Sequence, residues 1–293
     1  MVGGVPEGRS FARRRWLLPT GLVAVAALIG FGVLGPAVRA RHGAPRVATC
    51  PRISVRLGLH YPYSNYPENS LAAINAAHRL GVGKVEVDVW FSKDSIPVEI
   101  HDWTVDRTTA YTGKVSSYTA AQLEAMRLKV KGVPGDREMS SQHLPALQSA
   151  LERAAADGMA VSVEMKPHRL TSEQASAVLR LIRMVNDKAG TDVRSFYPRV
   201  LSEMRKAGYR GHLTLITTSY RALPKSSGYW MESINYGSNG THITAAEVAA
   251  LHAAGVLVDA WTPDTAAEVA TVPAGVDQVT TNNVRGYRAD TGC

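Results

Sequence analysis

The sequence predicts an α/β protein, a (β/α)8 barrel of the TIM type. Three observations favour this fold. Short runs rich in β-branched residues alternate with amphipathic helical segments, an order typical of parallel sheets. Eight of these runs are separated by enough chain for the crossover that parallel neighbours require. The chain has 293 residues, and eight βα units occupy about 250.

Each predicted element can be placed by its pattern. The expected strands end in polar residues and cover 55–60, 84–90, 159–166, 192–196, 212–217, 229–236, 255–262 and 277–281. Segments with apolar residues at helical spacing lie between them, at 70–80, 147–156, 172–189, 198–207 and 244–254. Gly81 follows the first of these helices at the position where a helix stops.

One apolar run breaks the alternation. Residues 97–101 follow the strand that ends at Trp90 after only six residues, too few for a crossover. We therefore expect residues 96–101 to fold back as the second arm of a β-hairpin. Residues 107–145, which precede the next barrel strand, are predicted to form a small insertion above the barrel mouth.

Residues 1–40 have the pattern of a signal peptide or a membrane anchor. Three arginines, Arg13 to Arg15, precede an uncharged apolar stretch over residues 16–38, and residues 37–40 resemble a small-x-small cleavage site. An uncleaved anchor is the alternative, and it would be the protein's only membrane contact. Both alternatives predict a secreted or extracytoplasmic protein, with a linker over 41–54 and a single barrel over 55–293.

The composition is that of a globular protein. It is 45% hydrophobic and 20% charged, which excludes collagen-like and low-complexity chains. The formal net charge is +8, but five arginines and one acid lie in residues 1–40. No dense basic run follows Arg39, so we expect no nucleic-acid partner.

Chemically reactive side chains collect at the carboxyl ends of the predicted strands, where TIM barrels carry their active sites. They are His60, Glu86, Asp88, His101, Glu164, Lys166 and Trp261. Glu86 and Asp88 lie two residues apart, so both face the same side of their strand. The same spacing recurs in Glu164 and Lys166.

Three carboxylates at one barrel mouth predict a metal site. They would repel and raise one another's pKa unless a cation lay among them. Oxygen ligands suit one hard divalent cation, Mg²⁺ or Ca²⁺. Two histidines beside such an ion can act as general acid and general base in phosphoryl transfer to water, and Lys166 can contact a phosphate oxygen as a point charge.

The order of these motifs resembles that of the glycerophosphodiester phosphodiesterases, a family of phospholipase C-like barrels, from about residue 57 to residue 283. The matching motifs are His60, Pro67-Glu68-Asn69-Ser70, Glu86-x-Asp88, Ser92-Lys93-Asp94, Pro97-Val98, His101-Asp102, Asp106-Arg107-Thr108-Thr109, Glu164-x-Lys166, Ser195-Phe196, Trp261-Thr262 and Gly275-Val276-Asp277.

The resemblance implies roles for these residues. Glu86, Asp88 and Glu164 would be metal ligands, and His60 and His101 the acid/base pair. Lys166 would contact the phosphate, and Trp261 would pack against the glycerol. The implied reaction splits a glycerophosphodiester into glycerol phosphate and an alcohol.

The chain departs from the family pattern at two places. Tyr61-Pro62 follows His60 where the family has Arg-Gly, and Asn282 follows Thr281 where the family has Asp. The missing arginine would make a bidentate phosphate contact, and Tyr61 would place an aromatic ring at the substrate instead. Two alternatives therefore stay open: a phospholipase D-like enzyme that acts on lysophospholipid or sphingomyelin, with choline on the ring face, and an inactive barrel that only binds phosphodiesters.

The two cysteines are predicted to form a disulfide. Cys50 stands just before the first barrel strand, and Cys293 is the last residue after the eighth. Barrel closure puts these two strands side by side. Residues 283–288 can descend as a short last helix, so the tail can reach the far face of the barrel.

Overall fold

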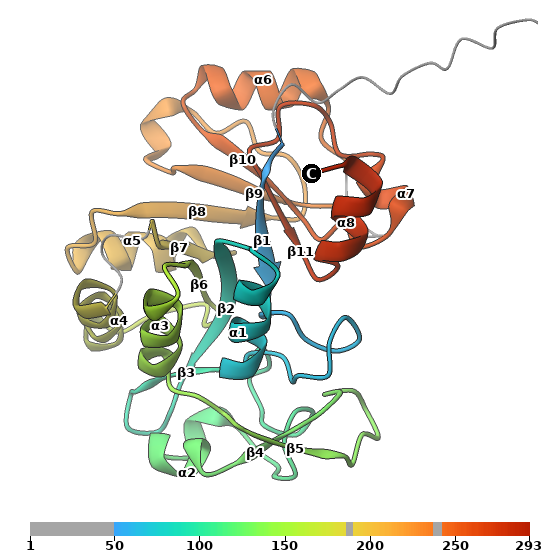
Figure 1. Ribbon diagram of the computed structural model, residues 1–293. Helices are drawn as coiled ribbons and strands as arrows, with labels where there is room; N and C mark the ends of the chain where they lie inside the picture. The colour runs from blue at the N-terminus through green and yellow to red at the C-terminus, as the bar shows by residue number, and fades with distance from the viewer. Residues whose placement is uncertain (1–49, 186–189, 237–241) are drawn as a thin grey trace, which may run out of the picture. The chain divides into compact units, whose positions relative to one another are not determined.

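The computed structural model describes residues 50–293 except 186–189 and 237–241. The predicted signal or anchor segment lies outside the described residues, as do residues 41–49 of the predicted linker. The end of that linker already belongs to the first strand, which begins at Arg52. The described residues belong to one compact unit, shown in Figure 1. Among the described residues, no helix is long and apolar enough to cross a membrane.

Eight parallel strands close into a barrel, as predicted. In spatial order they are β1 (Arg52–Arg56), β2 (Lys84–Phe91), β6 (Ala160–Met165), β7 (Asp192–Ser195), β8 (His212–Thr217), β9 (Met231–Asn235), β10 (Leu257–Trp261) and β11 (Gln278–Thr281). Strand β1 pairs with both β2 and β11. This double pairing closes the sheet and leaves no free edge among the eight strands.

Helices follow most of the strands and cover the barrel (Figure 1). They are α1 (Leu71–Arg79), α3 (Leu147–Ala156), α4 (Ser172–Val185), α5 (Pro198–Lys206), α6 (Ala245–Ala253), α7 (Ala266–Val269) and α8 (Val284–Thr291). The connection between β8 and β9 contains only a 3-10 turn, η2 (Lys225–Ser227). Local signals set several helix starts: the Ser70 side chain caps α1, and Thr244 forms a capping box with Glu247 at α6.

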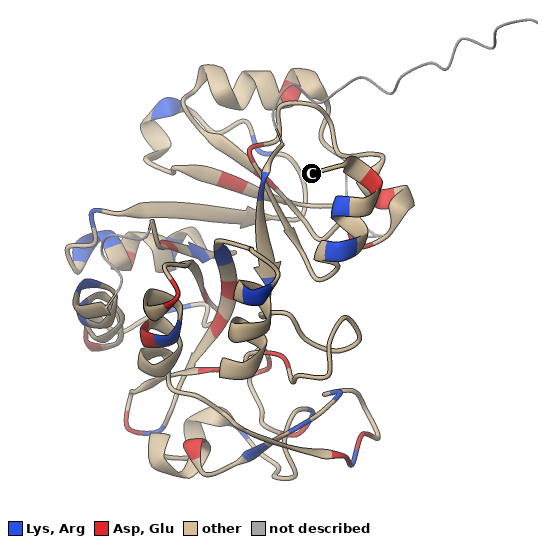
Figure 2. Ribbon diagram, viewed as in Figure 1, with Lys and Arg blue, Asp and Glu red and all other residues tan. Residues whose placement is uncertain are grey.

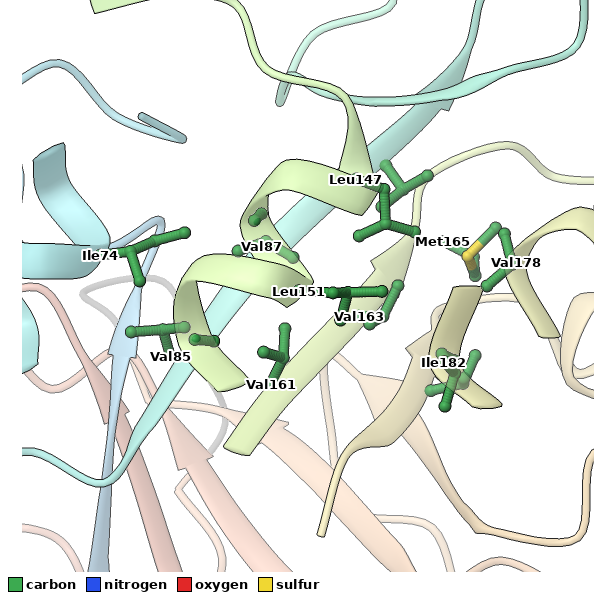
Figure 3. Packing of buried hydrophobic residues seen from close by; sticks show 14 of the residues in the cluster. Ile74, Val85, Val87, Leu147, Leu151, Val161, Val163, Met165, Val178 and Ile182 are labelled. Carbon is green, nitrogen blue, oxygen red and sulfur yellow. The ribbon is translucent and has the colours of Figure 1, made fainter. Parts of the chain in front are cut away.

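The alternation of side chains along each strand separates the core from the site. Figure 3 shows one face of β2 and β6, where Val85 and Val163 pack with Leu151 of α3. The opposite face carries the polar residues of the same strands, including Glu86 and Glu164. Because valine points outward into the helix layer, the carboxylates point into the barrel.

The predicted hairpin is present. Strand β3 (Pro97–Glu99) runs antiparallel to the end of β2, with Val89 opposite Glu99. The insertion that follows contains η1 (Val115–Ser117), α2 (Ala120–Glu124) and the two-stranded sheet of β4 (Arg127–Lys129) and β5 (Met139–His143). It has its own small apolar core, which includes Leu123, Leu128 and Leu144.

The two ends of the barrel are joined as predicted. Helix α8 brings Cys293 to Cys50, and the two form a disulfide with their Cα atoms 5.6 Å apart. The predicted end of β1 is wrong, however. Leu57 and Gly58 have φ values of 56° and 71°, and this left-handed turn ends the strand at Arg56. His60 therefore lies in the following loop and not at the strand end.

Candidate active site

Three buried carboxylates meet inside the barrel. Glu86 and Asp88 come from β2, and Glu164 comes from the neighbouring strand β6, where it is in register with Asp88. One ligand atom of each lies within 4.8 Å of the other two, and all three side chains are buried. Figure 2 shows acidic residues along the barrel strands as well as on the outer helices. The predicted ligand set is therefore brought together in space.

The charge of the carboxylates is partly compensated by Lys166. Lys166 Nζ lies 2.9 Å from Glu164 Oε1 and 3.3 Å from Asp88 Oδ1. Burial alone would raise the pKa of Asp88, but Lys166 holds it below its ordinary value. Burial and the charges of Asp88 and Glu164 raise the pKa of Glu86 well above its ordinary value. A divalent cation would relieve this repulsion, so the donor set fits a hard metal ion.

His101 is held by a chain of charged groups. Its Nδ1 lies 2.8 Å from Asp102 Oδ1, and this hydrogen bond, with those from Arg107, holds the pKa of Asp102 well below its ordinary value. Arg107 donates to both oxygens of Asp102, to both oxygens of Glu68 and to the backbone oxygen of Gly132. With Nδ1–H donated to Asp102, Nε2 of His101 is the nitrogen available for proton transfer.

His60 has a different environment. Its Nε2 lies 3.0 Å from Oδ1 of Asn282. Asn282 donates through Nδ2 to Asp264, 2.6 Å away, so its carboxamide oxygen faces the ring. The His60 Nε2 must therefore carry a proton, and only Nδ1 could accept another.

One cavity of about 270 Å³ opens over the carboxylates. Its lining residues are Arg56, Glu86, His101, Glu164, Lys166, Arg194, Phe196, Ile216, Ser233, Trp261 and Thr280. His101, Lys166 and Trp261 thus reach the predicted site. His60 and Tyr61 are not among the lining residues.

Two aromatic rings, those of Phe196 and Trp261, line the cavity. Trp261 contacts Phe196 edge to face, with ring centroids 5.5 Å apart, and its Nε1 donates to Ser233 O. Tyr61 lies beside the insertion, where Lys131 Nζ is 5.8 Å from the centre of its ring.

Two arginines in the cavity were missed by the sequence analysis. Arg56 is the last residue of β1 and is in register with Glu86. Burial alone would lower its pKa, but Glu86, Asp88 and Glu164 raise it. A prediction that ended β1 at the turn of Gly58 would have identified Arg56. The alternation of side chains along the strand then places Arg56 on the inward face, with these carboxylates.

Arg194 is the second missed cation. It is 2% exposed, and its Nη1 donates to Asp259 Oδ2 over 3.2 Å. Lys84 and Asp192, joined by a 2.7 Å ion pair, lie in the same buried network. No motif marks this group, because its members come from three different strands, β2, β7 and β10.

Comparisons with known proteins all identify the same family. The chain matches the model described as the glycerophosphoryl diester phosphodiesterase family over residues 63–285. It is 31% identical over 180 residues to glycerophosphodiester phosphodiesterase 1 of Rattus norvegicus, which covers 57% of this chain and 52% of that protein. The chain thus spans about half the length of this relative and of its other mammalian counterparts.

A bacterial relative is matched over nearly its whole length. The glycerophosphodiester phosphodiesterase of Caldanaerobacter subterraneus is 27% identical over 221 residues, which cover 75% of this chain and 90% of that protein.

Solved structures show the same fold. A putative glycerophosphoryl diester phosphodiesterase from Silicibacter pomeroyi has a TM-score of 0.69 at 21% identity, over 85% of this chain and 94% of that one. An Oleispira antarctica phosphodiesterase, solved in complex with the product sn-glycerol-3-phosphate, has a TM-score of 0.70 at 21% identity, over 83% and 97%.

Proposed function

This chain belongs to the glycerophosphoryl diester phosphodiesterase family, and on that premise we propose that it hydrolyses glycerophosphodiesters to glycerol phosphate and an alcohol. The observation that carries the proposal is a cluster of three buried carboxylates, two of which, Glu86 and Glu164, line one cavity together with Lys166 and His101. The relatives named as such enzymes, and the neighbour bound to sn-glycerol-3-phosphate, support this substrate class.

The carboxylates would hold one divalent cation, Mg²⁺ or Ca²⁺. The ion would supply Lewis acidity at a phosphoryl oxygen. Lys166, fixed between Glu164 and Asp88, would contact a phosphate oxygen as a point charge. Arg56 would supply the guanidinium that Tyr61 cannot, because it lines the cavity and makes no hydrogen bond to another described side chain. Trp261 would pack against the glycerol.

His101 is the stronger candidate for proton transfer. It lines the cavity, and Asp102 leaves its Nε2 free to protonate the leaving alkoxide. His60, the other predicted member of the pair, is hydrogen bonded to Asn282. We therefore propose that His101 carries more of the catalysis than His60.

The disulfide supports an oxidising compartment for the barrel. We accordingly propose that the barrel works outside the cytoplasm, secreted or tethered by the segment that precedes it.

The test compares His101→Ala with His60→Ala on glycerophosphocholine, with release of glycerol phosphate as the readout. We expect His101→Ala to lower kcat by about 10²–10⁴ and His60→Ala to lower it less. Wild-type protein that releases no glycerol phosphate from any glycerophosphodiester in Mg²⁺ or Ca²⁺ would overturn the proposed function. Equal losses in the two variants would overturn the ranking of the histidines and support an acid/base pair.

A further inference from the structure

We propose that the barrel mouth selects against a quaternary ammonium headgroup and favours substrates whose alcohol carries a negative charge. The inference rests on the proposed function and concerns the part of the substrate that leaves as the alcohol. It is carried by two aromatic rings in the loops around the catalytic cavity, each of which is already covered by a lysine of the same chain.

The two rings belong to Tyr61 and Trp103. Lys131 Nζ lies 5.8 Å from the centre of the Tyr61 ring. Lys114 Nζ lies 5.6 Å from the centre of the Trp103 ring. A choline group would bind such a ring through its negative face. Here a lysine ammonium occupies that position on both rings, and it would repel a second cation.

Trp103 also borders a groove beside the catalytic cavity. The groove has a volume of about 200 Å³ and is lined by Trp90, Phe91, Trp103, Lys114, Ser116, Pro167, Arg169 and Gln174. Trp103 is 56% exposed. A concave surface lined by aromatic side chains and a few charged groups is the kind of site that binds part of a small-molecule ligand.

Three residues of the groove adjoin residues assigned to the reaction. Trp90 Nε1 donates to the backbone oxygen of His101 over 3.1 Å. Pro167 directly follows Lys166, and Trp103 stands two residues after His101. If His101 protonates the leaving oxygen, the alcohol attached to that oxygen extends to the His101 side of the cavity, the side on which Trp90 and Trp103 lie. Trp261 and its proposed glycerol contact lie on β10, which is not a neighbour of β2.

The charge of this region is positive. Lys114 and Arg169 line the groove, and none of its lining residues is acidic. Among the described residues, no acid forms an ion pair with Lys114, Lys131 or Arg169. The nearby Asp136 accepts hydrogen bonds from the backbone nitrogens of Lys131 and Gly132. The charge of Lys131 is partly offset by Asp136, but Lys114 and Arg169 line the groove without an ion-pair partner among the described residues. An anionic alcohol would be attracted to these two groups, and choline would be repelled by them.

The test uses three diesters of glycerol phosphate: with choline, with glycerol and with glycolic acid. Their alcohols carry a charge of +1, 0 and −1. The lysines are replaced singly, as Lys114→Gln and Lys131→Gln, which uncovers the ring and removes the charge. Because the three alcohols differ in intrinsic reactivity, the readout is the ratio of variant to wild-type kcat/KM for each diester.

We expect each substitution to raise the choline ratio over the glycolate ratio by about two- to five-fold, the range for exposed charges. Glycerol should lie between the two. The effect should disappear in about 1 M salt, where the Debye length falls to about 3 Å. Lys129→Gln is the matched control. It removes a lysine from the same insertion whose Nζ donates to Asp106 O, and it should leave all three ratios equal.

The outcomes separate this inference from the proposed function. Equal ratios for all three diesters in Lys114→Gln and Lys131→Gln, with active wild type, would overturn the inference and leave the function standing. Wild type that cleaves none of the diesters would overturn the function. In that case calorimetric binding of the choline and glycolate diesters decides the inference, and tighter binding of the choline diester refutes it.

Discussion

Replacement of Arg107 by methionine should remove the hydrogen bonds that hold Asp102, and through it His101, in place. It should leave the residues that line the cavity unchanged. The Arg107 guanidinium makes five hydrogen bonds: two to Asp102, two to Glu68 and one to Gly132 O. Its side chain is 26% exposed, that of Glu68 11% and that of Asp102 28%. Methionine keeps most of the packing volume and removes all five donors.

The magnitude follows from the two carboxylates left behind. Loss of one partner from a buried ion pair costs about 3–5 kcal/mol. Because these groups are partly exposed, we expect the free energy of unfolding to fall by about 2–3 kcal/mol. Asp102 would keep its hydrogen bond to His101 but lose the groups that fix it. A displacement of about 1 Å in a catalytic group can lower the rate by about 10²-fold.

The assay combines urea unfolding with steady-state kinetics. We expect Arg107→Met to lower kcat by about 10- to 100-fold with little change in KM, because Arg107 does not line the cavity. The acid limb of the kcat profile should shift as Asp102 loses the arginine that lowers its pKa. Arg107→Lys should recover part of the activity, since it restores the charge but not the paired contacts.

Arg127→Met provides the control. Arg127 also lies in the insertion, and its Nε donates to the backbone oxygen of Ser140, so its loss should leave kcat unchanged. A folded Arg107→Met variant with wild-type kcat and an unchanged pH profile would refute the coupling between Arg107 and His101.

Three further predictions concern the metal, a buried acid and the disulfide. EDTA should abolish hydrolysis, and Mg²⁺ or Ca²⁺ should restore it. The added cation should also raise the Tm of the wild-type protein but not that of Glu164→Gln. A wild-type Tm that does not depend on the cation would argue against the metal site. Burial raises the pKa of Glu232 from 4.5 to about 7. Between these two pH values the native state binds more protons than the unfolded chain, so the free energy of unfolding falls as the pH rises. Glu232→Gln should flatten this pH dependence in denaturant titrations from pH 4.5 to 8, and an unchanged pH dependence would exclude Glu232 as its source. Reduction of the disulfide between Cys50 and Cys293, which are 243 positions apart, should lower the free energy of unfolding by about 2–5 kcal/mol. This is measured with and without dithiothreitol, and a Cys50→Ser/Cys293→Ser variant of wild-type stability would contradict it.

The barrel could be predicted from sequence because its signals are local and repeated. The strand from His212 to Thr217 and the helix from Leu147 to Ala156 have the predicted bounds. The short spacing between Trp90 and Pro97 allowed only a hairpin, and β3 confirms it. The last helix, expected over 283–288, spans Val284–Thr291.

The errors arose where a single backbone turn overrides a pattern. The apolar residues Leu57 and Leu59 extend the β-like run towards His60, but the positive φ of Leu57 and Gly58 turns the chain away after Arg56. The four-residue difference moved His60 off the strand and concealed Arg56. The carboxylates were found because strands β2 and β6 keep strict alternation up to Asp88 and Glu164.

The interior cations could not be predicted from local sequence. Arg194 is paired with Asp259, which is 65 residues away in the chain. Lys84 and Asp192 are likewise brought together only when the barrel closes. From sequence alone, a charged residue in a short strand is expected to be exposed, because charged residues are rarely buried without a partner of opposite charge. Here that partner is distant in the chain.

The bond between Cys50 and Cys293 makes the barrel a covalent ring. A single proteolytic cut anywhere in the 242 residues between the two cysteines would open the ring without releasing a fragment. Any tether that reaches Cys50 from the N-terminal side is also bonded, through the same sulfur, to the C-terminal end of the fold. A pulling force on that tether would pass across the bridge to α8 as well as into β1. The protein can therefore be nicked at a surface loop and still remain one molecule, attached wherever its N-terminal segment is attached.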